Sequence, residues 1–361
     1  MCPFTLMKLT RALTMALLLC AADAPADAAD KPAPAPAWQE IQLGEAGATY
    51  PFPVYGNHAL DGDTTRIRRV LIIQHGRARD GDAYFLAAGD LLKSHGIDAG
   101  DTLLLSPQFF APEQTARARL PGLPAWSAAG FAGGEDSVDP PFKVSSFQVY
   151  DDLLGLLTDR RRFPALRTIV MAGHSGGAVV VQQFAVLNRM DEKVRAAGIE
   201  MRYVVANASA YLYFTGERPQ GDGFAPYDAG QCPTYNDHRY GFDKMVRYGK
   251  DVAPADAYRR YMARNVIYLF GTEDTDPDHP ALDKSCSARA QGSHRLWRGR
   301  NYLRHERSLA AARGIADTHR SFEIVGVGHD QKAMFGSVCA AMTVFGVQDP
   351  KTGARCRETT N

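Results

Sequence analysis

The chain has 361 residues, of which 45% are hydrophobic and 22% are charged, and its formal net charge is +1. This composition suits a globular protein with a substantial core. The near-neutral charge gives no electrostatic support for a nucleic acid or an anionic membrane as a partner. The sequence has no repeat of fixed period, which argues against a solenoid or a propeller.

The N-terminus has the pattern of an export signal followed by a linker. A positively charged start precedes an apolar run over 12–20, and Ala26-Asp-Ala28 has the small residues of a cleavage site. The apolar run is shorter than the roughly 20 residues that a membrane span requires. We therefore expect a signal peptide over 1–28, removed near Ala28, and a Pro/Ala-rich linker over 29–44. The mature protein would be exported, to the periplasm or the medium.

Strands and helices are expected to alternate after the linker. The apolar and β-branched runs predict strands over 49–55, 66–74, 102–105, 168–172, 202–206, 266–271 and 322–326. Helical spacing and apolar content predict helices over 82–94, 145–158, 178–188, 300–313 and 331–345. The alternation predicts an α/β fold, a doubly wound and mostly parallel sheet between two helical layers. We expect one domain over 45–350 and a C-terminal tail over 351–361.

Three irregular segments interrupt this alternation, at about 106–143, 211–260 and 275–298. Long connections of this kind are seldom filler in compact enzymes, so we interpret them as a cap and as pocket walls. Their aromatic residues are candidate substrate contacts, and the alternative is that each one packs the cap against the core. The candidates for substrate binding are Arg77, Trp126, Phe131, Tyr211 and Tyr235.

Four cysteines lie outside the predicted signal peptide, and four cysteines allow three pairings. We favour Cys339–Cys356, which would tie down the C-terminal tail, and Cys232–Cys286, which would join two of the insertions. A zinc site is less favoured because no two of these cysteines have C-x₂₋₄-C spacing.

The most informative stretch is Gly173-His174-Ser175-Gly176-Gly177, which fits the pattern G-x-S-x-G. A buried strand is expected before it and a helix after it, and this context defines a nucleophile elbow. The strained turn needs small residues two positions before and two after the serine, and both are glycine. The helix N-terminus offers N–H groups and a positive dipole end to a developing oxyanion. The alternative is a glycine-rich turn without chemistry, because short patterns recur by chance.

In a parallel sheet the chemistry should lie beyond the carboxyl ends of the strands, and polar residues do follow three of them. His75-Gly76-Arg77 follows the strand over 66–74, Asp274 follows that over 266–271, and His329 follows that over 322–326. The order serine, aspartate, histidine is the order of the α/β-hydrolases. On these motifs the chain resembles the α/β-hydrolase superfamily over roughly 45–350, as a secreted member similar to serine esterases and lipases.

The expected catalytic residues are Ser175 as nucleophile, His329 as general base and acid, and Asp274 as the acid that orients the histidine. Asp274 fits the Gly-x-x-Asp pattern that the resemblance implies, and Asp276 is the reserve. Alternating carboxylates also leave open a calcium site near Asp276 and Asp278, although an EF-hand is rejected. His174 is expected to be structural or to line the pocket, because neighbours at an elbow point apart.

The resemblance implies an oxyanion hole built from the N–H of Gly176 and that of Arg77 or Gly76. The Arg77 side chain has two interpretations, which the sequence does not separate. It would recognise an anionic or carbonyl-rich substrate, or it would pair with Asp80.

The leading hypothesis is a secreted serine hydrolase that cleaves a carboxylic ester of small or medium size through an acyl-enzyme, without a metal or organic cofactor. An amidase or peptidase of the same fold is the first alternative. A non-catalytic binding protein on the same scaffold is the second. The sequence gives no oligomeric state.

Overall fold

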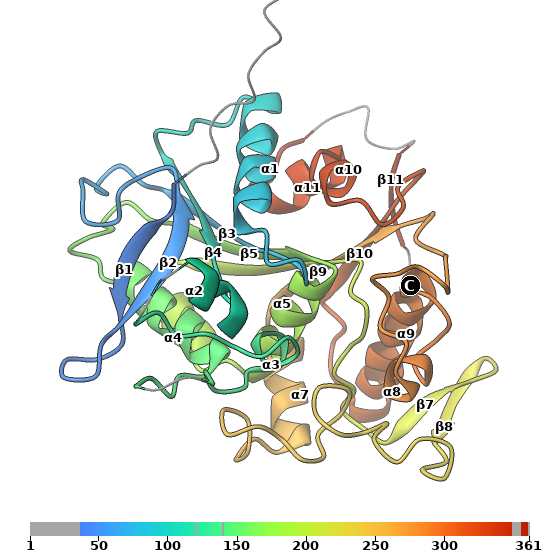
Figure 1. Cartoon of the computed structure of the whole chain (residues 1–361). Helices are drawn as coiled ribbons and strands as arrows, with labels where there is room; N and C mark the ends of the chain where they lie inside the picture. Colours follow the sequence, from blue (N-terminus) through green and yellow to red (C-terminus); the bar gives the residue numbers. More distant parts are fainter. Residues whose placement is uncertain (1–36, 119, 121, 139–140, 349–354, 360–361) are drawn as a thin grey trace, which may run out of the picture. The chain divides into compact units, whose positions relative to one another are not determined.

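A nine-stranded mixed sheet lies at the centre of the fold (Figure 1). The computed structural model describes residues 37–118, 120, 122–138, 141–348 and 355–359. The signal peptide predicted over 1–28 lies outside the described residues. The strand order is β1-β2-β4-β3-β5-β6-β9-β10-β11.

Six strands at the centre of the sheet are parallel, as the sequence predicts. They are β4 (Thr102–Pro107), β3 (Arg69–Gln74), β5 (Thr168–His174), β6 (Glu200–Ala206), β9 (Asn265–Gly271) and β10 (Arg320–Ile324). Antiparallel strands complete both edges, namely β2 (Tyr50–Gly56) and β1 (Gln39–Leu43) on one side and β11 (Cys356–Glu358) on the other. The carboxyl ends of all six parallel strands therefore lie along the same side of the sheet.

Helices cover both faces of the sheet, and each layer encloses its own apolar core. The smaller layer contains α1 (Gly81–Ser94), α10 (Gln331–Phe335) and α11 (Val338–Phe345). The larger layer contains α4 (Ser146–Leu157), α5 (Gly176–Leu187), α7 (Pro254–Met262) and α9 (Arg295–Arg313). Figure 1 shows the two layers on opposite sides of the strands. This is the doubly wound arrangement expected from the alternation of elements.

The larger layer is fixed by local signals that the sequence carries. Ser145 caps α4, since its Oγ accepts the N–H of Phe147 at 3.1 Å. The buried residues of α4 recur at helical spacing, so this helix presents one apolar face to the sheet. In α5 nearly every residue is buried, which agrees with its unbroken apolar run. α5 begins directly after Ser175 and is packed between the sheet and α7.

Several expected boundaries are wrong. Part of the linker expected over 29–44 is β1, because its polar–apolar alternation buries Ile41 and Leu43 against the larger layer. The tail over 351–361 contributes β11 to the sheet. The helix expected over 331–345 is two helices, since Ser337 starts a new one by accepting the N–H of Ala340.

The three insertions also contain short elements, which the sequence analysis did not predict. They are α2 (Pro112–Ala118) and α3 (Gly130–Gly133) in the first, the hairpin β7 (Glu217–Gln220) and β8 (Gly223–Pro226) with α7 in the second, and α8 (Cys286–Arg289) in the third. A further short helix, α6 (Asp191–Ala196), precedes β6. No helix within the described ranges is long and apolar enough to cross a membrane.

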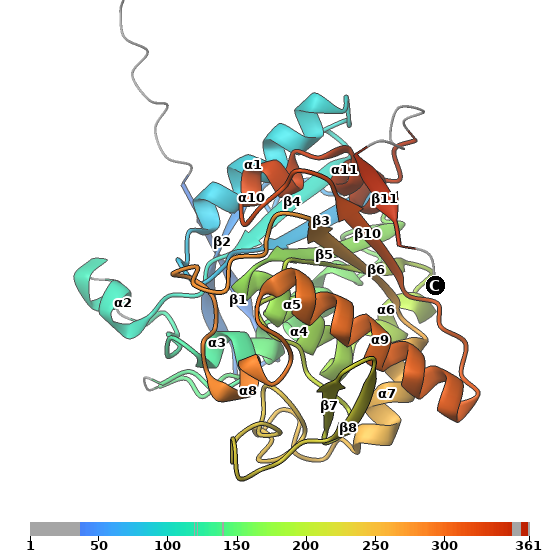
Figure 2. The ribbon, with the colours of Figure 1, turned by 90° about the vertical axis from the view of Figure 1, so that its right-hand side faces the viewer.

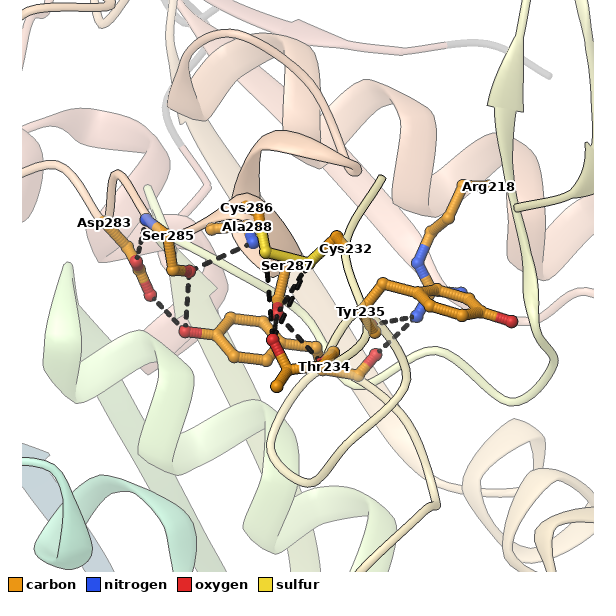
Figure 3. The surroundings of a disulfide bond; sticks show 10 residues. Arg218, Cys232, Thr234, Tyr235, Asp283, Ser285, Cys286, Ser287 and Ala288 are labelled. Atoms are coloured by element: carbon orange, nitrogen blue, oxygen red, sulfur yellow. Dashed lines mark hydrogen bonds between the residues drawn. A yellow bond between two sulfur atoms is a disulfide. The ribbon is translucent and has the colours of Figure 1, made fainter. Parts of the chain in front are cut away.

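Both expected disulfides are confirmed. Cys339 of α11 is bonded to Cys356 of β11, and Cys232 is bonded to Cys286 at the start of α8. Figure 3 shows the second bond joining the loop around Thr234 to the segment that contains Asp283 and Ser285. Thr234 Oγ1 and Ser287 Oγ lie 2.9 Å apart beside the bond. The second and third insertions are therefore covalently tied at one point.

Replacing Cys232 and Cys286 together with serine should lower the free energy of unfolding by on the order of 4 kcal/mol. The bond closes a loop of 54 residues, and its loss restores conformational freedom to the unfolded chain. Urea denaturation followed by circular dichroism measures the change. The Cys339→Ser/Cys356→Ser pair, with a separation of 17 residues, should cost about 3 kcal/mol and serves for comparison. An unchanged urea midpoint in the first variant would contradict the prediction.

Candidate active site

Ser175 stands at a sharp turn between β5 and α5. Its backbone has φ 59° and ψ −121°, which is unusual for a residue with a side chain. The turn closes because the flanking residues are glycine. A Cβ on Gly173 would collide with the carbonyl group of Gly177, and a Cβ on Gly177 would collide with the carbonyl oxygen of Gln74. The geometry is that of the elbow expected from G-x-S-x-G.

Three side chains from three strand ends meet at this turn, as predicted for Ser175, Asp274 and His329. His329 Nε2 lies 3.0 Å from Ser175 Oγ, and His329 Nδ1 lies 2.8 Å from Asp274 Oδ2. These contacts form a continuous hydrogen-bonded chain from hydroxyl to imidazole to carboxylate. Asp276, the reserve acid, is exposed, and its Oδ1 accepts the N–H of Asp278 at 2.8 Å. The structure therefore brings Asp274, and not Asp276, to the histidine.

A buried arginine that the sequence analysis did not single out completes this group. Arg295 Nη1 donates to Asp274 Oδ1 at 3.1 Å, so each carboxylate oxygen has a different partner. Both side chains are almost fully buried. Burial alone would raise the pKa of Asp274, but the hydrogen bond from His329 and the nearby Arg295 outweigh it and hold that pKa below its usual value. The carboxylate is consequently kept ionised.

Two further histidines flank the His329 ring. His174 stacks on it with the ring centroids 4.6 Å apart, and His279 meets it edge-on at 4.9 Å. His174 is buried, and burial together with the neighbouring His329 lowers its pKa to about 3. A neutral ring therefore packs against His329. This packing favours the structural one of the two roles expected for His174, which stays a prediction.

The backbone nitrogen of Arg77 lies close to Gly176, the residue that follows Ser175. A Cβ on Gly176 would lie 3.1 Å from the backbone nitrogen of Arg77, so the two residues are in close backbone approach. Neither the N–H of Arg77 nor that of Gly176 donates a hydrogen bond to any residue that the structure describes. The carbonyl of Gly76 accepts the N–H of Arg79, which turns the chain at this point. The close approach of the Arg77 nitrogen to Gly176 fits the expected oxyanion hole and is the observation that favours Arg77 over Gly76 as the second donor.

Two buried side chains hold the loop that carries Arg77. His75 donates from Nδ1 to the Gly76 carbonyl at 2.9 Å and accepts the Phe109 N–H at Nε2, 3.1 Å away. Burial lowers the pKa of His75 to about 4, which agrees with a neutral ring in these two roles. Arg79 donates to the carbonyls of Phe109, Trp126 and Ser127. The first insertion is thereby fixed against the loop.

A pocket of about 430 Å³ opens beside Ser175. Its walls come from the Arg77 loop, from α3, from the start of α5 and from the segment before α8. Figure 2 shows α3 and α8 on the same side of the sheet as α5. The lining residues are Arg77, Ala128, Ala129, Phe131, Ala132, Gly176, Val179, Ser209, Arg239, Ala281, Leu282, Asp283, Lys284 and Ser285. Arg77 and Phe131 thus lie where substrate contacts were predicted.

The other three predicted contacts do not line this pocket. Trp126 is fully buried and donates from Nε1 to the Val144 carbonyl. Tyr211 is fully buried and stacks on Tyr302 at 4.6 Å. Tyr235 packs against the guanidinium of Arg218 instead. The full burial of Trp126 and Tyr211 speaks against a substrate contact, whereas Tyr235 is half-buried and its role stays a prediction. An aromatic residue in an insertion has the same sequence pattern whether it faces the core or a cavity.

Arg77 makes no ion pair with Asp80 or with any other carboxylate among the residues that the structure describes. The interpretation in which Arg77 pairs with Asp80 is therefore removed.

Within the described part of the chain, no three histidine, cysteine or carboxylate side chains are grouped to hold a metal.

Comparisons with known proteins identify the fold. No family model matches the chain, and no curated protein is similar in sequence. Among solved structures, poly(aspartic acid) hydrolase-1 from Sphingomonas sp. KT-1 is similar at a TM-score of 0.60 and 20% identity, over 86% of this chain and 99% of that one. The poly(3-hydroxybutyrate) depolymerase from Bordetella parapertussis is similar at a TM-score of 0.60 and 20% identity, over 87% and 92%.

The strand order, the parallel centre of the sheet and these two similarities define an α/β-hydrolase fold. The fold class expected from the sequence is thereby confirmed. At this level of identity the similarity shows the fold alone, so the activity has to be argued from the site.

Proposed function

We propose that the protein is an exported serine hydrolase that cleaves carboxylic esters through an acyl-enzyme intermediate. The hydrogen-bonded chain from Ser175 through His329 to Asp274 is the observation that carries the proposal. A nucleophile, a base and an orienting acid at these distances are what acyl transfer by serine needs.

The first half of the reaction forms the acyl-enzyme. Ser175 Oγ attacks the ester carbonyl while His329 Nε2 takes the hydroxyl proton. Asp274 accepts the hydrogen bond from Nδ1, which fixes the tautomer and stabilises the imidazolium. The C–O bond to the alcohol then breaks, and His329 returns the proton to the departing oxygen. In the second half, His329 Nε2 takes a proton from water as the water oxygen attacks the acyl carbonyl. The bond to Ser175 Oγ then breaks, His329 returns the proton to Oγ, and the carboxylic acid leaves.

The negative charge on the tetrahedral intermediate needs preorganised donors. The N–H groups of Arg77 and Gly176 are free and adjacent, and that of Gly176 lies at the positive end of α5. Removing one such donor in another hydrolase costs about 3 kcal/mol of transition-state stabilisation. Both donors here are backbone groups, so side-chain truncation does not delete them.

The comparisons support hydrolysis as the class of reaction. Both similar structures are named for hydrolysis or depolymerisation of a polymer. The pocket of about 430 Å³ suits a small or medium ester, or one residue of a longer chain. No observation favours the amidase alternative over the ester, so the substrate panel pairs each ester with its amide.

Export is supported by the two disulfides, because such bonds persist in oxidising compartments and are rare in the cytosol. N-terminal sequencing of the mature protein from the periplasm or the medium would test it, with a start soon after Ala28 as the expected result.

A fluorophosphonate probe tests the function without a choice of substrate. Mass spectrometry should locate the adduct on Ser175 of the folded protein, and both Ser175→Ala and His329→Ala should abolish it. Ser209→Ala, in the same pocket, should still be labelled at Ser175. Absence of labelling, together with no turnover of 4-nitrophenyl acetate, would refute a serine hydrolase and favour the non-catalytic alternative.

A further inference from the structure

The walls of the pocket carry an excess of positive charge. Arg77, Arg239 and Lys284 line it, and Asp283 is the single carboxylate among its lining residues. The protein as a whole is almost neutral, with a net charge of +1. The cations at the pocket are therefore a local concentration and not a reflection of overall composition.

Asp283 is already engaged, and among the residues that the structure describes no carboxylate pairs with the other two cations, Arg77 and Lys284. Its Oδ2 accepts the Tyr240 hydroxyl at 2.7 Å and lies 3.3 Å from the guanidinium of Arg239. Asp283 Oδ1 accepts the N–H of Ser285. Lys284 donates to the carbonyl of Asp278, a neutral acceptor. The charges of Arg77 and Lys284 thus remain available to a ligand.

The wall that bears Lys284 is held in place from two sides. The disulfide Cys232–Cys286 anchors the segment at its C-terminal end, as Figure 3 shows. Ser285 Oγ donates to the hydroxyl of Tyr240, so the second insertion also braces it. A fixed wall matters because a preorganised cation binds an anion without first losing side-chain and loop entropy.

Arg77 is the cation of the pocket that lies nearest in the chain to the expected oxyanion hole. Its backbone nitrogen lies close to Gly176, where the oxyanion would be held, and Arg77 is an exposed residue that lines the pocket. An ester whose carbonyl oxygen occupies that position would lie beside the pocket that Arg77 lines. The planar fork of arginine matches a carboxylate with two parallel hydrogen bonds.

We propose that this pocket selects esters that carry a carboxylate close to the scissile bond, with Arg77 as the principal anchor and Lys284 as the second cation. The inference rests on the proposed function and adds the substrate class. A partly enclosed cavity lined by one sign of charge also concentrates anionic substrates, which raises kcat/KM.

Matched pairs of esters test the charge on each side of the bond. On the acyl side, 4-nitrophenyl hydrogen adipate is compared with 4-nitrophenyl hexanoate, which has the same chain length and no carboxylate. On the alcohol side, 4-acetoxybenzoate is compared with its methyl ester. We expect the wild type to prefer the anionic member of at least one pair by about ten-fold or more in kcat/KM. Raising the ionic strength should reduce that preference.

The variants assign the preference to the pocket. Arg77→Gln should lower the ratio of anionic to neutral kcat/KM by about ten-fold, and Arg77→Lys should restore most of it. Lys284→Gln should lower the ratio less. Arg66→Gln removes an exposed arginine just before β3, at the opposite end of that strand, and should leave the ratio unchanged.

The outcomes separate this inference from the proposed function. If the wild type cleaves both members of each pair equally, or if Arg77→Gln keeps the anionic preference, the inference is wrong while the serine hydrolase stands. If neither ester is cleaved and the fluorophosphonate does not label Ser175, the proposed function fails and the inference fails with it.

Discussion

Replacing Ser175 with alanine should lower kcat for 4-nitrophenyl esters by a factor of about 10⁴ to 10⁶. The hydroxyl is the atom that forms the acyl bond, and no other group among those that contact His329 offers a nucleophile at its Nε2. Activity that survives would come from direct attack by water, with the backbone N–H groups stabilising the oxyanion that this attack creates. Folding should be preserved, because alanine keeps the Cβ that the turn at φ 59° already accommodates.

The same experiment contains a stricter test in the double variant. If Ser175 and His329 act as one unit, Ser175→Ala/His329→Ala should be no slower than Ser175→Ala alone. Ser94→Ala, at the exposed end of α1, controls for handling and should keep wild-type rates. Multiplicative losses in the double variant, or more than a hundredth of the activity in Ser175→Ala, would contradict the proposed roles.

The parts of the site that the sequence predicted are those with a local signature. Ser175 was found because glycines at fixed offsets are required to close its turn, and the collisions that a Cβ would make at Gly173 and Gly177 explain why. Asp274 and His329 were found because the carboxyl ends of parallel strands meet at one edge of a sheet. Each inference needs only the strand positions, which the apolar runs made clear.

What the sequence did not predict depends on packing between distant segments. Arg295 reaches Asp274 across 21 positions, and nothing in the sequence around either residue marks the contact. Trp126 and Tyr211 were assigned to the pocket although both are buried, since composition does not say which way a side chain faces. The edge strand β11 has only three residues, too few for a periodic pattern.

Replacing Arg295 with methionine should lower the free energy of unfolding by about 3 to 5 kcal/mol at neutral pH and shift the acid limb of the activity profile upward. Methionine leaves the Asp274 carboxylate buried with one of its two partners missing. Burial raises the pKa of Asp274, and in this variant only the contact with His329 remains to lower it, so the pKa rises. A protonated Asp274 no longer stabilises an imidazolium on His329, and activity is lost at a higher pH than in the wild type.

The sign of the stability effect follows from the same pKa. In the wild type the pKa of Asp274 lies below its ordinary value of 3.8, so the stabilisation is present above that value and is lost as the pH falls through the folded-state pKa. The deficit of Arg295→Met relative to wild type should therefore be largest near neutral pH and shrink below about pH 4. Urea midpoints measured across this range, together with pH profiles of kcat/KM, give both quantities.

Arg264→Met is the matched control, because it also removes a buried arginine from an ion pair, with Glu192 at 3.0 Å. Arg264 precedes β9, whereas Asp274, the partner of Arg295, follows it. The two ion pairs therefore lie at opposite ends of one strand. The control should lose stability without moving the acid limb, and Arg295→Lys should recover part of the wild-type profile because it keeps the charge. If the limb stays in place in Arg295→Met, or moves equally in Arg264→Met, then Arg295 supports the fold but does not set the ionisation of Asp274.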